Sequence, residues 1–197
     1  MAVEVETPAL LRLRDIVPNA IRTTDLSSAY EFSHPLNFRR WGTAMIDHRN
    51  GAVVWRIEFA EEDGQNVLEF GKPLTRKIEP GRLAIGRAAG VVAYHALFYV
   101  RGPFRGLGFA PAVLAAESEL YARWGVAQIQ ILAADEGAAY WVRKHGFRPQ
   151  SWEHLRERLP GWLARKKLPP VAPATPADLP WDYLVEASPL VVYKDLE

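Results

Sequence analysis

Runs of hydrophobic and polar residues predict several β-strands in the first half of the chain. Residues 10–16 alternate between apolar and basic side chains, which is typical of a strand with one buried face. Residues 43–49 and 52–59 are rich in strand-forming side chains and flank the pair Asn50-Gly51. Asn-Gly between two such runs predicts a hairpin with a two-residue type I′ turn. Residues 91–100 are almost continuously apolar and predict a buried strand.

The segments between these strands have weaker patterns. Residues 25–32 begin with Asp25, a favourable helix N-cap, and predict a short helix. Residues 66–70 predict a further short strand. Residues 72–90 are rich in Gly, Pro and Arg, so we interpret them as a connection.

The period of the pattern changes after residue 101. Residues 101–108 form a Gly-rich loop, and residues 109–124 carry apolar side chains at helical steps of three and four. Residues 127–133 then predict a strand, and residues 135–145 predict a second helix that ends at a glycine. Strand, loop, helix, strand and helix in this order predict an α/β unit, in which a ligand sits beyond the strand ends.

The C-terminal part combines a helical start with many prolines. Ser151 is placed to begin a helix that Pro160-Gly161 would break. The prolines at positions 169, 170, 173, 176 and 180 favour an extended surface segment. Residues 190–193 predict a closing strand.

Composition narrows the class of protein. The 197 residues are 49% hydrophobic and 24% charged, with a net charge of +1, which is typical of a globular chain of one domain. The absence of cysteine excludes disulfides and thiolate chemistry. A near-neutral charge argues against general binding to nucleic-acid backbones. No apolar run reaches the ~20 residues of a membrane span, and the N-terminus does not resemble a signal peptide, so we expect a cytoplasmic protein.

Two common kinds of catalytic site are missing from the sequence. The five histidines have no metal-ligand spacing, so we expect no metal. No serine occurs in a Gly-x-Ser-x-Gly nucleophile elbow.

The remaining candidate is the glycine loop between the strand at 91–100 and the helix at 109–124. Glycines at positions 102, 106 and 108 let backbone N–H groups approach a ligand closely. The first N–H groups of the following helix are unpaired and carry the positive end of its dipole. This arrangement is a cradle for phosphate groups. A tight strand-to-helix turn without any ligand remains the alternative from these residues alone.

Two segments resemble motifs of the GCN5-related N-acetyltransferase (GNAT) superfamily. Arg105-Gly-Leu-Gly-Phe-Ala110 matches Gln/Arg-x-x-Gly-x-Gly/Ala, the acyl-CoA pyrophosphate motif. Asp135-Glu-Gly-Ala-Ala-Tyr-Trp-Val-Arg-Lys-His-Gly-Phe147 is similar to the second signature, Asn-x-x-Ala, an aromatic pair and Gly-Phe. A helix and a strand separate the two motifs, as in that family. The resemblance covers residues 91–147 well and the first 90 residues only in outline.

The resemblance implies a single α/β (α+β) domain over residues 1–197, with a helical and Pro-rich insertion at about residues 148–189. Its fold is a mixed, mostly antiparallel sheet flanked by helices, with a splayed central strand pair. Acetyl-CoA, or another acyl-CoA, would be the co-substrate and would lie in that gap. The residues implied to bind it are Phe98, Tyr99, Val100, Arg105, Gly106, Leu107, Gly108, Phe109, Ala110, Asp135 and Ala138.

The catalytic groups are less directly implied. Many family members place a Tyr on the second helix to protonate the leaving thiolate, and that place holds Val142. We therefore take Tyr140 as the candidate acid, with core packing as its alternative role. His95 is the candidate base because it is the nearest group with a suitable pKa. Neighbouring strand residues face opposite sides, so only one of Tyr94 and His95 can face the cleft.

The resemblance implies transfer of an acetyl group to a primary amine of a small molecule or a protein. The alternatives are an acyl-CoA sensor without turnover and a transferase for longer chains, for which Ala93, Ala96 and Ala133 would leave room. We expect residues 148–189 to cover the acceptor mouth, because three tryptophans there need burial. A homodimer contact or a cover for a sheet face is the equal alternative.

Overall fold

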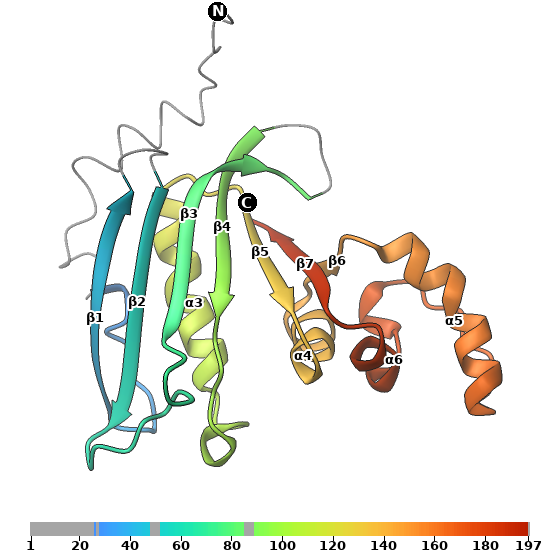
Figure 1. Cartoon of the computed structure of the whole chain (residues 1–197), viewed down its shortest axis with the longest axis horizontal. Coiled ribbons are helices and arrows are strands. Elements are labelled where there is room, and N and C mark those ends of the chain that lie inside the picture. Colours follow the sequence, from blue (N-terminus) through green and yellow to red (C-terminus); the bar gives the residue numbers. More distant parts are fainter. Residues whose placement is uncertain (1–25, 27, 48–51, 85–88, 197) are drawn as a thin grey trace, which may run out of the picture. The chain divides into compact units, whose positions relative to one another are not determined.

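The computed structural model describes residues 26, 28–47, 52–84 and 89–196 (Figure 1). The chain divides into two compact units. The first contains Met1–Gln128 with Leu196–Glu197, and the second is Ile129–Asp195. The expectation of one domain over the whole chain stays a prediction.

Four strands of the first unit form an antiparallel sheet in sequence order (Figure 1). They are β1 (Phe38–Asp47), β2 (Ala52–Glu61), β3 (Leu74–Arg82) and β4 (Ala89–Leu97). The predicted strand at 91–100 is confirmed as β4, although it ends three residues earlier. β2 supplies much of the core, because Trp55 and Phe59 are fully buried.

The predicted hairpin is confirmed, but its register differs from the expected one. A two-residue Asn50-Gly51 turn would pair Arg49 with Ala52. The structure instead pairs Asp47 with Ala52, and β1 begins at Phe38, five residues before the predicted start. The turn itself, the strand expected at residues 10–16 and Asp25 lie outside the described residues, whereas Leu26 is helical.

Two predictions between the hairpin and β4 are wrong. Residues 66–70 make only isolated bridges, Ala60 with Asn66 and Leu68 with Val100, rather than a strand. Residues 72–90 contain the strand β3, which we had interpreted as a connection. The hydrophobic pattern did not indicate this strand, because the charged residue Arg76 occupies one of its buried positions.

The predicted helix after the glycine loop is confirmed as α3 (Phe109–Arg123), preceded by the short 3₁₀ turn η1 (Gly102–Phe104). α3 buries one face against the sheet of its own unit. The ring of Phe109 lies 5.1 Å from that of Phe59, and Trp124, just after the helix, lies 5.8 Å from Trp55. Gly125 then adopts φ +63°, which ends the helix.

The second unit alternates short strands and helices. Its strands β5 (Gln128–Ala133, which begins at the unit boundary), β6 (Arg148–Pro149) and β7 (Leu190–Asp195) have the order β5-β7-β6, with β6 and β7 antiparallel. Its helices are α4 (Glu136–His145), α5 (Trp152–Lys166) and α6 (Trp181–Glu186), with the 3₁₀ turn η2 (Pro176–Asp178) before α6. The helix, strand and closing strand predicted at 135–145, 127–133 and 190–193 are confirmed.

α5 contradicts the expected break at Pro160-Gly161, because the helix runs through both residues. Pro160 cannot donate a backbone hydrogen bond, which leaves the carbonyl of Arg156 without its usual helical partner. Both Pro160 and Gly161 are exposed. A buried stripe on the other face of the helix supports it; its members are Leu155, Leu159, Trp162 and Leu163.

The molecule is therefore a mixed α/β protein of mostly antiparallel strands flanked by helices, as predicted. The splay expected between the strand before Val100 and the strand at 129–133 relates the two units and stays a prediction. Within the described residues, no helix combines the length and the apolar character that a membrane crossing needs.

Candidate functional site

The backbone that follows β4 is held along one edge by residues 67–69. The carbonyl of Tyr99 accepts a hydrogen bond from the N–H of Glu69 at 2.8 Å, and the N–H of Arg101 donates to Val67 at 3.0 Å. Successive residues of an extended chain direct their backbone groups to opposite edges. The backbone groups of Phe98 and Val100 therefore face the other edge.

The loop before α3 offers open backbone at its two last glycines. Gly106 and Gly108 adopt φ of +78° and +81°, a region that favours glycine. A Cβ added to Gly106 would meet nothing within 4 Å, and one on Gly108 would meet only His34 Nε2, at 3.9 Å. The positive φ and the surrounding space explain the glycines at both positions.

The start of α3 has unused hydrogen-bond donors. No side chain of the described residues caps the N-terminus of this helix. Within the described part of the chain, no hydrogen bond engages the backbone N–H groups of residues 106–110. Pro111 has no N–H, so Phe109 and Ala110 supply the free N–H donors of the first helical turn. The Nε of Arg105 donates to the carbonyl of Val100 at 2.8 Å and so ties the loop to the end of the strand.

His34 is a neighbour of this loop that sequence reasoning did not single out. Its Nδ1 accepts the N–H of Leu36 at 3.0 Å, so a neutral ring carries its hydrogen on Nε2. That Nε2 is buried and has no hydrogen-bond partner among the described residues. No local pattern could have identified it, because His34 and Gly108 lie 74 positions apart in the chain.

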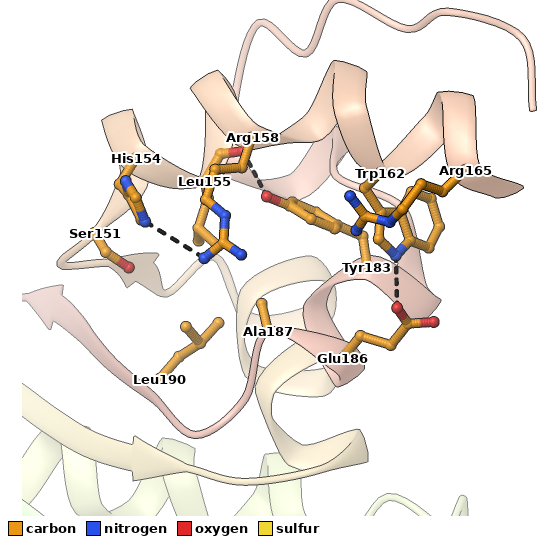
Figure 2. Close-up of a pocket in the computed structure, with 10 residues that line it drawn as sticks. All are labelled: Ser151, His154, Leu155, Arg158, Trp162, Arg165, Tyr183, Glu186, Ala187 and Leu190. Carbon is orange, nitrogen blue, oxygen red and sulfur yellow. Dashed lines mark hydrogen bonds between the residues drawn. The ribbon is translucent and has the colours of Figure 1, made fainter.

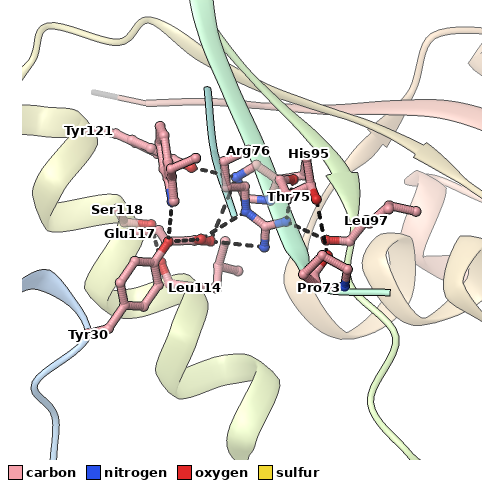
Figure 3. Close-up of polar contacts among 11 residues, drawn as sticks. Tyr30, Pro73, Thr75, Arg76, His95, Leu97, Leu114, Glu117, Ser118 and Tyr121 are labelled. Carbon is pink, nitrogen blue, oxygen red and sulfur yellow. Dashed lines mark hydrogen bonds and ion pairs between the residues drawn. The ribbon is translucent and has the colours of Figure 1, made fainter. Parts of the chain in front are cut away.

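His95 lies in a closed polar cluster within the first unit (Figure 3). Its side chain is buried, and its Nε2 lies 2.9 Å from the hydroxyl of Tyr121 and 3.7 Å from Glu117 Oε2. Glu117 in turn accepts Arg76 Nε at 2.8 Å and the hydroxyl of Tyr30 at 2.6 Å. Each of these side chains has a partner inside the protein, although the buried Nδ1 of His95 has none among the described residues.

This position corrects the expectation that His95 has a pKa suited to a general base. Burial, reinforced by the positive charge of Arg76, lowers the pKa of His95 well below 6.5. Tyr94, the neighbour on β4, is only half-buried, and burial and then Glu79 raise its pKa. His95 therefore has the surroundings of a neutral structural residue, and it does not enter our functional proposal.

The same cluster joins α3 to the end of β4. Besides its pair with Glu117 on α3, Arg76 donates through Nη1 to the carbonyl of Leu97 at 2.9 Å. Its guanidinium also lies 5.3 Å from the ring centre of Phe98. The buried side chain of Arg76 thus connects the end of β4, which precedes the glycine loop, with α3, which follows it.

The residues of the second signature lie in the second unit. Asp135 adopts φ +49°, its side chain does not cap α4, and its N–H donates to Ser188 Oγ at 3.0 Å. The side chain of Asp135 is therefore not the N-cap of α4. Ala138 is fully buried. Tyr140 is half-buried, its ring lies 4.7 Å from that of His145, and burial raises its pKa.

The predicted site residues thus fall into two groups. Phe98, Tyr99 and Val100 lie close in sequence to residues 105–110 and belong with them to the first unit, whereas Asp135, Ala138 and Tyr140 belong to the second. Among the described residues, no group of three or more His, Asp or Glu side chains is placed to hold a metal ion.

Comparisons with known proteins add little. No family model matches the chain, and no curated protein matches it. The chain is similar to a solved structure described as an acetyltransferase of the GNAT family from Staphylococcus aureus Mu50, with 14% identity over 76% of this chain and 70% of the other. The TM-score is 0.37. Similarity at this level assigns neither a family nor an activity.

Proposed function

We propose that the protein is an acyl-CoA-dependent N-acyltransferase that transfers an acetyl group to a primary amine. The observation that carries the proposal is the uncapped start of α3, where open backbone at Gly106 and Gly108 leads into unused N–H donors. A pyrophosphate is the kind of ligand that fits such donors, because its oxygens accept several hydrogen bonds and its charge suits the helix dipole. The unpartnered Nε2 of His34 adds a side-chain donor beside the same loop.

The resemblance of residues 105–110 and 135–147 to the two GNAT motifs narrows the nucleotide ligand to coenzyme A. In the second segment, α4 ends at Gly146 in a left-handed conformation and Phe147 is buried. The N–H of Val100, on the backbone edge that faces away from residues 67–69, would donate to a carbonyl of the pantetheine arm, whereas the carbonyl of Val100 already accepts Arg105 Nε.

The proposed reaction needs little covalent chemistry from the protein. The amine nitrogen attacks the thioester carbonyl carbon, a C–N bond forms, and the C–S bond breaks. The amine loses a proton to solvent, and the departing thiolate gains one. Positioning of the two reactants would supply most of the acceleration.

Tyr140 is our candidate for the proton donor. Because burial raises the pKa of its hydroxyl, the group stays protonated near neutral pH and can give a proton to a thiolate. Its ring contacts with Trp141 and His145 support packing as the alternative role.

A binding protein without turnover is the second candidate function. The observation that favours it is Val142, a buried aliphatic residue at the place where the family often carries its Tyr. Acyl chains longer than acetyl, an acceptor mouth covered by residues 148–189, and a cytoplasmic location remain predictions.

The experiment that tests the proposal is the affinity of Gly108→Asp for coenzyme A, measured by calorimetry. The aspartate would remove two charge-assisted hydrogen bonds to the pyrophosphate and place a negative charge beside it. We therefore expect binding to weaken roughly 100-fold or more. Gly125→Asp is the matched control, because Gly125 also has φ +63° and open space but lies at the other end of α3. Equal affinities of the folded Gly108→Asp variant and the control would exclude the acyl-CoA site.

Turnover is tested separately by the release of free coenzyme A from acetyl-CoA in the presence of a panel of amines. Tyr140→Phe should lower kcat roughly 100-fold if the hydroxyl protonates the thiolate. A loss below about threefold would assign Tyr140 to packing, since general acids contribute far more. Saturable binding without any release would favour the sensor. A preference for butyryl-CoA over acetyl-CoA would indicate a transferase for longer chains.

A further inference from the structure

A hollow of about 290 Å³ lies within the second unit, between α5 and the turn that leads from α6 into β7 (Figure 2). One wall consists of Ser151, just before α5, and of residues on one face of that helix: His154, Leu155, Arg158, Trp162 and Arg165. The other wall consists of Tyr183, Glu186, Ala187 and Leu190. The volume suits a small organic molecule, because it lies near the lower end of typical ligand pockets.

The hollow carries an excess of positive charge. Arg158 and Arg165 lie two helical turns apart on α5, and Figure 2 shows them on either side of Tyr183. Within the described residues, neither arginine has a carboxylate partner at ion-pair distance. Arg158 makes only a long contact of 3.5 Å with His154. The two guanidinium groups are therefore available to an anion.

The single carboxylate in the lining is already engaged. Glu186 accepts Lys166 Nζ at 2.5 Å and the indole N–H of Trp162 at 2.8 Å. These hydrogen bonds, together with the charges of Lys166 and Arg165, hold the pKa of Glu186 below its ordinary value. Burial raises the pKa of Tyr183, while the charges of Arg158 and Arg165 both oppose that rise. Both arginines thus act on the same small region.

The base of the hollow is apolar and aromatic. The rings of Trp162 and Tyr183 pack 5.2 Å apart, and both side chains are buried. The hydroxyl of Tyr183 donates to the carbonyl of Leu155 at 2.7 Å, which fixes the ring. Leu155 and Leu190 are also buried. A ligand that contacts both parts of the hollow must combine an anionic group with an apolar body.

We propose that this hollow binds a small organic anion, a carboxylate or a phosphate ester, whose charged group pairs with Arg158 and Arg165 while its apolar part contacts the Trp162–Tyr183 pair. Guanidinium groups suit this task because their donors match carboxylate and phosphate oxygens two at a time. The site is independent of the proposed acyl-CoA loop, since all its residues belong to the second unit.

The test uses calorimetric titration of the full-length protein with phenyl phosphate, phenylacetate, inorganic phosphate and phenol. We expect saturable binding of phenyl phosphate or phenylacetate with a Kd on the order of 1 mM or tighter, and at least a roughly tenfold weaker Kd for the other two probes. The stronger of the two aromatic anions identifies the preferred charged group. Binding of phenol equal to that of both aromatic anions, or no saturable binding at all, would overturn the proposal.

Substitutions locate the binding. The double variant Arg158→Gln/Arg165→Gln should weaken the better anion at least tenfold. Arg156→Gln is the matched control, because Arg156 lies on the same helix outside the hollow and is paired with Glu153 at 2.6 Å. Its affinity should equal that of the wild type. An unchanged Kd in the double variant, with its circular dichroism spectrum intact, would disprove the site.

Discussion

The helices α3 and α5 have the same length, 15 residues each, but they use charge in opposite ways. α3 turns Glu117 into the core of the first unit, where the carboxylate is fully buried and bonded to Arg76 and Tyr30. α5 presents Arg158 and Arg165 on an exposed face of the second unit, with no carboxylate partner among the described residues.

This difference in burial indicates which charged side chains of the protein can bind a ligand. A buried charge has a large desolvation cost, so the fold tolerates Glu117 only because its partners are complete. An exposed arginine is hydrated and has no such requirement, so it can bind an anion from solution. The buried cluster is therefore a structural element, and the exposed arginines are candidates for binding.

The largest expected effect comes from breaking the buried cluster. Glu117→Gln removes the charge that balances Arg76 and should lower the free energy of unfolding by about 3–5 kcal/mol. Urea denaturation measures this loss. Glu119→Gln is the control two residues away on the exposed side of α3, and it should change the free energy by less than about 0.5 kcal/mol. Equal effects of the two variants would contradict the comparison.

A smaller gain is expected on α5. Pro160→Ala restores the missing hydrogen bond to the carbonyl of Arg156 in an exposed part of the helix. The second unit should become more stable by roughly 1–3 kcal/mol, since proline disfavours a helix interior by about 3 kcal/mol relative to alanine. Amide hydrogen exchange in α5 is the measurement. Faster exchange in this variant would mean that Pro160 stabilises the helix by contacts that outweigh the lost bond.

The pH dependence of stability sharpens the comparison further. Because the pKa of His95 is lower in the folded protein than the ordinary 6.5, the unfolded chain binds the proton more readily. Stability is therefore complete above pH 6.5 and falls as the pH decreases below it, by at most about 1.4 kcal/mol per pH unit for each such group. His95→Gln should flatten this slope in the first unit. Burial and Lys194 also lower the pKa of His145, so part of the slope should persist.

The smallest effect is expected at the exposed arginines. Arg158→Gln should leave the free energy of unfolding within about 0.5 kcal/mol of wild type, because no ion pair is lost. Urea denaturation without added anions is the measurement. A loss as large as that of Glu117→Gln would show that Arg158 is structural and would remove the contrast between the two helices.

Sequence reasoning located α3, β4 and α4 well because their apolar residues follow the period of the element. It did not predict β3, because Arg76 occupies a buried position of that strand. It also predicted a break in α5 at Pro160, whereas burial of the opposite face of the helix outweighs the effect of the proline. The open glycines before α3 were predicted from a local motif. The buried ion pair of Arg76 with Glu117, beside His95, was not predicted, because the two residues lie 41 positions apart in the chain and meet only after folding.

The connection between α5 and α6 is held by side-chain hydrogen bonds and is restricted by its prolines. The carboxylate of Asp178 accepts the N–H groups of Ala174 and Thr175, and Arg143 on α4 donates to the carbonyl of Ala177 at 3.1 Å. Five prolines between positions 169 and 180 restrict the unfolded segment before any contact forms. Ordering this segment therefore sacrifices less conformational entropy than ordering a glycine-rich linker of equal length. The prolines of this segment thus limit the conformations that can connect α5 with α6 before the chain folds.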